Sequence, residues 1–256
     1  MHILISNDDG IHAPGILNLI QVAREFGRIT VVAPNSPQSG MGHAISVGKP
    51  LRIYEESLTD DHLIGYAVSG TPADCVKIAT GVIMDEEPDL IVSGINHGYN
   101  SSVSSIYSGT LSAAREGALQ GIPAIGFSLG NYQHEADMTT ARAVARSVIG
   151  QAIEQGLRSG QLLNVNIPDL PLDQLKGIRV VRQAMGRWVE QFDERTDPYG
   201  RKYYWLTGNF ALQDEGDDTD IHALRDGYAS VTPMTHDLTA HRELPEITQW
   251  TFGVKQ

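Results

Sequence analysis

Short apolar runs alternate with longer segments of helical periodicity, and this alternation constrains the fold more than any other feature of the chain. The first apolar run covers residues 3–6. After Pro14, apolar residues recur at helical spacing from Ile16 to Phe26, and a second apolar run follows at 29–33. Repeated strand–helix–strand units are typical of a mostly parallel sheet with helices on both faces. The sequence therefore predicts the α/β class.

Further strands and helices are expected beyond this first unit. Apolar or alternating runs predict strands at residues 64–69, 90–92, 123–128, 163–167 and 228–231, with a less regular extended stretch at 44–54. Helical periodicity and capping signals predict helices at residues 71–83, 108–119, 141–153 and 219–225. The stretch from Gly94 to Tyr107 shows neither pattern. It is expected to be a loop of a length that is unusual in a compact domain.

From about residue 185 to residue 213, aromatic side chains are interspersed with charged ones. The turn-forming run Asp-Pro-Tyr-Gly at 197–200 lies inside this segment, so a β-hairpin arm is expected. No repeat or low-complexity linker divides the chain. We therefore expect one domain at 1–256, with an α/β core at 1–184, the arm at about 185–213, and a segment at 214–256 that rejoins the core or a partner subunit.

Composition excludes several classes of partner. The 256 residues are 41% hydrophobic, which allows a sizeable core, and they carry a formal net charge of −12. Without a dense Lys/Arg block, the chain is not expected to bind a nucleic-acid polymer or an anionic membrane.

Cys75 is the single cysteine, so no intramolecular disulfide is expected. No signal-peptide pattern or membrane-length apolar run is present, and the expected location is the cytoplasm.

Asp8 and Asp9 stand side by side where the first strand ends. In a regular strand they would point to opposite faces, but Gly10 allows the chain to turn so that both carboxylates converge. Two close carboxylates repel each other unless a cation lies between them, and Mg²⁺ or Mn²⁺ prefers such oxygen ligands. The alternative is an ordinary Asp-Asp-Gly turn with no metal.

Loops that follow successive parallel strands meet at one edge of the sheet, where ligands bind in open α/β folds. Ser39 and Asn96 lie on such loops and offer neutral oxygen ligands. Asn35, Ser36 and Asn100 satisfy the same positional argument, so position alone does not choose among them.

Ser108, Gly109 and Thr110 begin a predicted helix. The free backbone N–H groups of a helix N-terminus and its positive dipole end suit a phosphate group, while the alternative is a simple Ser or Thr helix cap. Histidines could assist proton transfer near the same edge, although glycine-rich loops also carry histidine without a chemical role. These candidates are His12, His43 and His97.

Several ordered motifs together resemble one known family. They are Ile-Leu-Ile-Ser-Asn-Asp-Asp-Gly at 3–10, His-Ala-Pro-Gly-Ile at 12–16, Ala-Pro at 33–34 with Gln-Ser-Gly at 38–40, Val-Ser-Gly-Ile-Asn at 92–96, Tyr-Ser-Gly-Thr at 107–110, Asn-Val-Asn-Ile-Pro at 164–168, and Gly-Tyr at 227–228 with Ser-Val-Thr-Pro at 230–233. This series is similar to the SurE survival-protein nucleotidases. It spans roughly residues 3 to 240.

The resemblance implies a Rossmann-like metallophosphatase that hydrolyses nucleoside 5′- and 3′-monophosphates and, in some members, short polyphosphate. It implies one divalent cation held by Asp8, Asp9, Ser39 and Asn96, and a homodimer or homotetramer with an exchanged C-terminal arm. On that basis the cation would polarise a phosphoryl oxygen and position the attacking water, while residues 108–110 hold the phosphate. Direct attack by water is expected rather than an aspartyl phosphate on Asp8. The glycine-rich loop around His97 varies in the family, so substrate preference does not follow.

Three alternatives fit parts of the pattern. Phosphatases of the haloacid-dehalogenase type also begin with a strand that ends in aspartates, but with the pattern Asp-x-Asp. A Mg²⁺-binding receiver-like module is about half this length. A nucleotide-binding module without turnover would be expected to carry a Gly-rich phosphate motif, which this sequence lacks. The acidic run that includes Asp214, Glu215, Asp217, Asp218 and Asp220 is expected to be a solvated loop rather than a second metal site.

Overall fold

The computed structural model describes residues 1–58, 63–214 and 216–253. Its strands are β1 His2–Ser6, β2 Arg28–Pro34, β3 Ile53–Ser57, β4 Ile64–Val68, β5 Leu90–His97, β6 Ala124–Leu129, β7 Leu162–Ile167, β8 Ile178–Val180, β9 Gly186–Thr196, β10 Lys202–Leu212 and β11 Ala229–Met234. Its helices are α1 Pro14–Ala23, α2 Pro72–Ile78, α3 Ser104–Tyr107, α4 Gly109–Leu119, α5 Thr139–Gln155, α6 Asp220–Arg225 and α7 Leu244–Ile247, with a π-helical turn at Ala79–Ile83 and a 3₁₀ turn at Leu172–Gln174.

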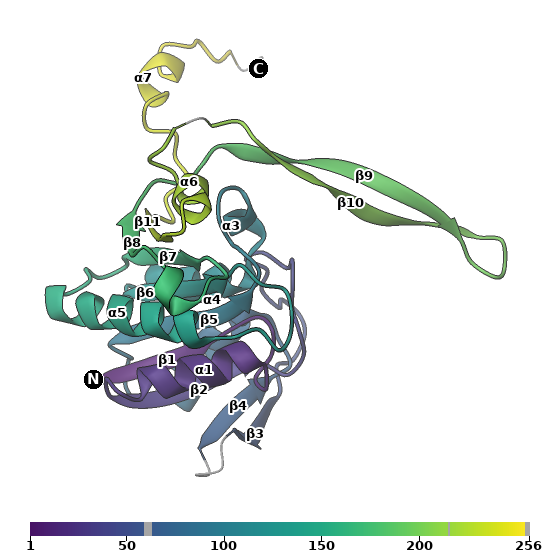
Figure 1. Ribbon diagram of the computed structural model, residues 1–256. Coiled ribbons are helices and arrows are strands. Elements are labelled where there is room, and N and C mark those ends of the chain that lie inside the picture. Colours follow the sequence, from purple (N-terminus) through teal and green to yellow (C-terminus); the bar gives the residue numbers. More distant parts are fainter. Residues whose placement is uncertain (59–62, 215, 254–256) are drawn as a thin grey trace.

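Nine strands among the described residues form one sheet in the order β3-β4-β2-β1-β5-β6-β7-β11-β8. The pairings are parallel except those of β3 with β4 and of β7 with β11. Figure 1 shows the sheet in the body of the molecule, between layers of helices. The chain moves outward from β1 to β2 and β4 and then returns to β5 on the other side of β1. The predicted α/β fold with a mostly parallel sheet is confirmed.

Helices cover both faces of the sheet, and each face has its own apolar core. On one face α1 and α5 pack together over a cluster that includes Ile16, Phe127 and Val144. On the other face α2 and α4 pack over a cluster that includes Leu4, Val76 and Ala114. Alternate residues of β1 enter opposite clusters, because successive strand side chains point to opposite faces. Strand β1 is thereby held in the centre of the fold.

The N-terminus of α2 forms as the sequence predicts. The Thr71 hydroxyl accepts the Asp74 N–H at 3.2 Å, and the Asp74 carboxylate accepts the Thr71 N–H at 2.9 Å, which is a capping box. The same carboxylate accepts the Ser46 N–H at 2.9 Å, and the Thr71 hydroxyl donates to Ala44 O at 2.7 Å. These bonds hold residues 44–46 against the N-terminus of α2.

Three sequence predictions differ from the structure. The extended stretch predicted at 44–54 is mostly loop, and strand β3 covers only its end and the residues that follow. Strand β5 does not stop at Val92 but continues to His97, and α3 lies inside the predicted loop before Tyr107. The acidic run is not simply solvated, because Asp220 is fully buried and Asp214 pairs with Arg182. Glu215 lies outside the described residues.

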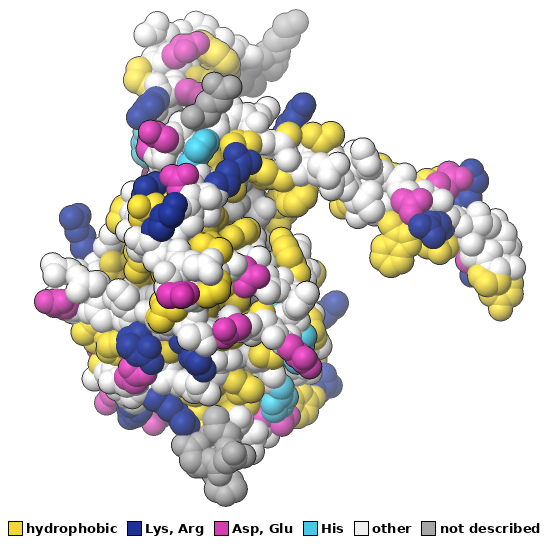
Figure 2. All heavy atoms as spheres, viewed as in Figure 1, with side chains coloured by type: hydrophobic (Ala, Val, Ile, Leu, Met, Phe, Trp, Pro, Cys, Tyr) yellow, Lys and Arg dark blue, Asp and Glu magenta, His cyan; other side chains and the backbone are white. Residues whose placement is uncertain are grey.

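The predicted arm is a two-stranded antiparallel hairpin of β9 and β10. It projects from the body in Figure 1, and Figure 2 shows apolar side chains along it. Many of its large apolar side chains are exposed, namely Trp188, Val189, Phe192, Tyr203, Tyr204, Trp205 and Leu206. After the arm, α6 and β11 return to the body, and β11 enters the sheet between β7 and β8. Within the described residues, no helix is both long and apolar enough to cross a membrane.

Candidate active site

A tight turn after β1 presents the two aspartates. The Asn7 side chain donates to Gly10 O at 2.8 Å and accepts the Gly10 N–H at 3.2 Å, which closes an Asx-type turn around Asp8 and Asp9. Gly10 has a φ of +104°, a conformation that L side chains rarely adopt. The glycine therefore permits the turn that the sequence analysis expects.

Asp8 is only 5% exposed and lies against the first turn of α4. The Thr110 hydroxyl donates to Asp8 Oδ1 at 2.5 Å, and a Cβ added to Gly109 would stand 2.5 Å from Asp8 Cβ. Burial, followed by repulsion from Asp9, raises the pKa of Asp8 to about 7, although hydrogen bonding from Thr110 and the Gly109 backbone partly offsets this. A cation beside Asp8 would relieve both of the causes that raise its pKa.

Asp9 lies at the opening, with its side chain 22% exposed. Its Oδ2 lies 3.4 Å from the His97 backbone N, which donates to it, and 3.5 Å from His97 Nδ1. Of the three candidate histidines, His97 is therefore the one in contact with the aspartate pair. His12 instead lies 3.4 Å from Glu56, and His43 bonds Glu116 at 2.9 Å.

Ser39 shares a cavity with the aspartates because its loop is bonded to the turn that follows β1. The Gln38 N–H donates to Asp8 O at 2.8 Å, and the Gly42 N–H donates to Tyr107 O at 3.1 Å. Ser39 is exposed between these two attachments and lines the same cavity as Asp8.

Asn96 is brought to the aspartates by an irregularity in β5. The register with β6 shifts between Ser93 and Asn96, as in a β-bulge, so the strand continues past the end of β1. The Asn96 side-chain nitrogen donates to Gly98 O at 2.8 Å. This bond orients the amide and leaves its oxygen available as a ligand.

Of the two alternatives for residues 108–110, the structure shows the helix cap, and phosphate binding stays a prediction. The Ser108 hydroxyl accepts the Leu111 N–H at 3.0 Å and is thus the N-cap of α4, while the Thr110 hydroxyl donates to Asp8. The Thr110 hydrogen is therefore used by Asp8, whereas Ser108 only accepts in its bond and lines the cavity, so its O–H can donate to a phosphate together with the backbone and dipole of the helix end.

One cavity of about 340 Å³ joins these groups. It is lined by Asp8, Asp9, Ser39, Asn96 and Ser108, while Thr110 is fully buried behind Asp8. Asn100, one of the alternative ligands, also lines it, whereas Asn35 and Ser36 line a neighbouring cavity.

The neighbouring cavity, of about 450 Å³, shares Asp9, His97 and Tyr132 with the first. One or both cavities are also lined by three residues that were not predicted from the sequence, Tyr132, His134 and Trp188. Tyr132 and His134 follow β6, so the rule that ligands bind beyond the carboxyl ends of strands could have found them. Trp188 comes from the arm, and no local sequence signal places it here.

The donor chemistry of the first cavity fits a hard divalent cation. Two carboxylates, an amide oxygen and a hydroxyl are all oxygen ligands, which Mg²⁺ and Mn²⁺ prefer. In the part of the chain that the structure describes, no group of three or more His, Cys, Asp or Glu side chains could hold a metal. A cation at Asp8 and Asp9 would therefore depend on neutral oxygens and water for its remaining ligands.

Comparison with known proteins identifies the family. Residues 3–190 match the family described as Survival protein SurE. The chain belongs to this family. It is 52% identical over 252 residues to a protein of Christiangramia forsetii named 5′-nucleotidase SurE, with 98% of this chain and 97% of the relative covered.

Two further proteins are similar at lower sequence identity. A protein of Chlorobium limicola with the same name is 46% identical over 98% of this chain and 96% of its own length. The crystal structure of the SurE protein from Aquifex aeolicus superposes with a TM-score of 0.82 at 36% identity, covering 97% of this chain and 98% of that one. Membership of the SurE family favours a nucleotidase over the three alternative classes considered from the sequence.

Proposed function

We propose that this SurE-family chain is a 5′-nucleotidase that requires a divalent metal and hydrolyses nucleoside 5′- and 3′-monophosphates to nucleoside and phosphate. The observation that carries the proposal is the buried carboxylate of Asp8 beside Asp9, in a cavity that also contains Ser39 and Asn96. The relatives from C. forsetii and C. limicola, which are named 5′-nucleotidase SurE, support it. Short polyphosphate is a second substrate class that we propose to test.

Asp8, Asp9, Ser39 and Asn96 would hold one Mg²⁺ or Mn²⁺ ion. When bound, such an ion polarises a phosphoryl oxygen and positions the attacking water. The protein supplies the rest of the arrangement: Thr110 orients Asp8 through its hydroxyl, and the first turn of α4 binds the phosphate through its backbone and dipole.

We expect water, rather than Asp8, to attack the phosphorus atom. The Asp8 carboxylate is buried, already accepts a hydrogen bond from Thr110, and would be engaged with the cation, so it is a poor nucleophile. Peptide mapping after rapid quenching decides the point, because a phosphorylated peptide that contains Asp8 would contradict direct attack by water.

The exposed apolar side chains of the arm support self-association. An isolated hairpin is marginally stable in water, so an arm of this size requires a surface to cover it. We propose a homodimer or homotetramer in which arms are exchanged between subunits. Trp205, 60% exposed, is a suitable position to test. Trp205→Arg is expected to lower the mass measured by analytical ultracentrifugation, and an unchanged mass would contradict an interface at this position.

Phosphate release from AMP and 3′-AMP, with and without Mn²⁺ or Mg²⁺, tests the function itself. Turnover should require the metal, stop with EDTA and return when metal is added in excess. Asp8→Asn should lower kcat/KM by roughly 10²-fold or more, because it removes charge from a metal ligand. The matched control is Asp226→Asn, an exposed aspartate paired with Arg179, which should not change the rate. Turnover that persists in EDTA, or an undiminished rate in Asp8→Asn, would refute the proposal.

A further inference from the structure

A largely buried segment, residues 98–105 (loop 98–105), runs into the first turn of α3 and forms one wall of the site cavity through Gly98, Asn100 and Ser104. Ser102 is fully buried and has a φ of +51°, in the left-handed region that non-glycine residues rarely adopt. A buried polar segment with a strained backbone keeps its shape only if rigid neighbours bond its polar groups. The shape of this wall therefore depends on the elements to which the loop is bonded.

The start of the loop is bonded to the sheet. Asn100 N donates to Asn166 Oδ1 at 2.8 Å, and the Asn164 side chain donates to Asn100 O at 2.9 Å. The Asn100 side chain donates to Ser128 Oγ at 2.8 Å. The two asparagines of the Asn-Val-Asn motif thus hold one end of the loop on β7.

The middle of the loop is bonded to Asp220, the first residue of α6. Asp220 Oδ2 accepts the Ser102 N–H at 2.7 Å, across 118 positions of sequence. The other oxygen, Oδ1, accepts the Ala184 N–H at 3.0 Å and the Ile221 N–H at 2.8 Å. The side chain is fully buried, so backbone N–H groups take the place of water around this carboxyl group.

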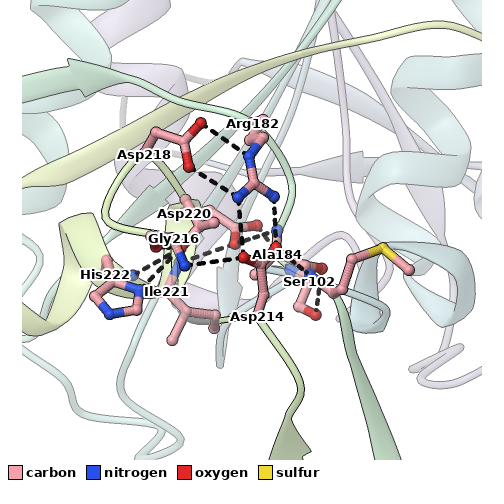
Figure 3. Close-up of polar contacts among 11 residues, drawn as sticks. Ser102, Arg182, Ala184, Asp214, Gly216, Asp218, Asp220, Ile221 and His222 are labelled. Carbon is pink, nitrogen blue, oxygen red and sulfur yellow. Dashed lines mark hydrogen bonds and ion pairs between the residues drawn. The ribbon is translucent and has the colours of Figure 1, made fainter.

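The same contacts reach the base of the arm. Ala184 lies two residues before β9, and its carbonyl oxygen accepts the Ser102 hydroxyl at 2.9 Å. Figure 3 shows Ser102 and Asp220 on either side of Ala184. The Asp220 side chain consequently holds two segments: the loop that lines the cavity, and the residue at the base of the arm.

A second set of contacts lies at the base of the arm and does not reach the loop. Arg182 donates to Asp214 at 2.5 and 2.9 Å and to Asp218 at 2.9 Å (Figure 3). Its side chain is 45% exposed. Arg182 therefore provides a comparison in which the base of the arm is disturbed while the bonds between Asp220 and the loop remain.

We propose that Asp220 is a positioning residue for substrate binding, which fixes loop 98–105 against the cavity and joins it to the base of the arm. The proposal deepens the nucleotidase function and rests on it for the kinetic test. Both carboxyl oxygens accept N–H groups from different segments, so an amide at this position would turn its own N–H₂ toward one of those donors. Asp220→Asn thus disturbs the loop with almost no change in volume.

The kinetic test compares Asp220→Asn with Arg182→Gln. In Asp220→Asn the KM for AMP should rise roughly tenfold, the effect of one hydrogen bond to a charged group, with a smaller change in kcat. Calorimetric titration with Mn²⁺ alone should give the wild-type affinity, because Asp220 does not line the metal ligands' cavity. In Arg182→Gln the KM should equal that of wild type. An unchanged KM in Asp220→Asn, an equal rise in Arg182→Gln, or a parallel loss of Mn²⁺ affinity would overturn the proposal.

Hydrogen exchange tests the same point without activity. In Asp220→Asn, peptides that cover 98–105 should exchange faster than in wild type, while peptides of β1 and α4 should not. In the wild-type chain itself the Ser102 amide should exchange as slowly as amides within the sheet, and rapid exchange would overturn the proposal even if the variant does not fold. If wild type hydrolyses no nucleotide, the proposed function fails, and the exchange result still decides the role of Asp220.

Discussion

Glu116 in α4 is a buried carboxylate that connects the loop carrying Ser39 with the rest of the fold. It is 3% exposed and accepts hydrogen bonds from Lys77 at 2.7 Å and Gln120 at 3.2 Å, and it bonds His43 at 2.9 Å. His43 lies four positions after Ser39. The substitution Glu116→Gln removes the charge and keeps the size of the side chain, and we expect it to destabilise the protein and to loosen this loop.

The expected loss of folding free energy in Glu116→Gln follows from the pKa of Glu116. Burial alone would raise it, but hydrogen bonds from His43, Lys77 and Gln120 outweigh burial and lower the pKa from 4.5 to about 2. A shift of this size corresponds to about 3 kcal/mol of folding free energy at pH 7. Lys77 is 46% exposed, and water screens part of its interaction, so we expect a loss of about 2 kcal/mol.

The stabilisation that Glu116 contributes should be larger at neutral pH than at acidic pH. A carboxyl group with a lowered pKa in the folded state contributes its stabilisation above its unfolded pKa, here 4.5, and loses it as the pH falls through the folded value of about 2. The difference in unfolding free energy between wild type and Glu116→Gln should therefore be largest at neutral pH. It should fall to roughly half near pH 3 and close toward pH 2.

Urea unfolding at fixed protein concentration, repeated between pH 7 and pH 3, measures this difference. The control is Glu86→Gln, which removes an exposed ion pair with Arg28 at 3.4 Å and should leave the unfolding free energy unchanged. If Glu116→Gln is as stable as wild type at pH 7, or if the difference does not depend on pH, the ion pairs of Glu116 do not stabilise the fold.

Three further substitutions test contacts around the site. Gly109→Ala places a Cβ 2.5 Å from Asp8 Cβ, and the displaced carboxylate should cost roughly 10²-fold in kcat/KM without loss of the circular-dichroism spectrum. Thr110→Val removes the hydrogen bond to Asp8 and should weaken Mn²⁺ binding about tenfold in calorimetry, while Thr110→Ser should not. Gly15→Ala brings a Cβ into the carbonyl oxygen of Ile95 in β5 and should lower the unfolding free energy by about 2 kcal/mol, whereas Gly81→Ala, whose Cβ would meet no other segment, should not lower it in urea unfolding.

The sequence predicts those features of the fold that depend on local pattern. The alternation of strands and helices, the capping box at Thr71 and the hairpin arm are confirmed, because periodicity, capping and turn chemistry act over a few residues. The extension of β5 to His97 escaped prediction. It depends on a register shift against β6 that contains Gly94, with a φ of +122°, and the predicted strand stops before this glycine although a glycine inside a strand can mark a bulge.

For the candidate site, position along the chain identifies the edge of the sheet but not the contacts there. Asp8 and Asp9 are candidates because they lie just after an apolar strand, and their role as metal ligands stays a prediction. The bond from Thr110 to Asp8 joins residues 102 positions apart, and the burial of Asp220 depends on donors from Ser102 and Ala184. A solvated acidic loop was the wrong expectation for Asp220, since long-range backbone donors decide whether a carboxyl group can be buried.

The way the arm joins the body bears on how subunits could exchange it. The last bond before the hairpin is that of Gln213 N–H to Met185 O at 2.9 Å, so the two ends of the arm leave the body side by side. On the body side of these residues, β8 pairs with β11 in the sheet, and the backbones of Arg182 and Thr219 form an isolated parallel β-bridge. A rotation of the hairpin about Met185 and Gln213 therefore breaks no pairing in the sheet. Trp188 lies just beyond this point and lines the site cavity, so any such rotation would move an aromatic side chain of the cavity lining. If subunits exchange arms as proposed, the exchange would also displace Trp188 from the cavity lining, because both depend on this one junction.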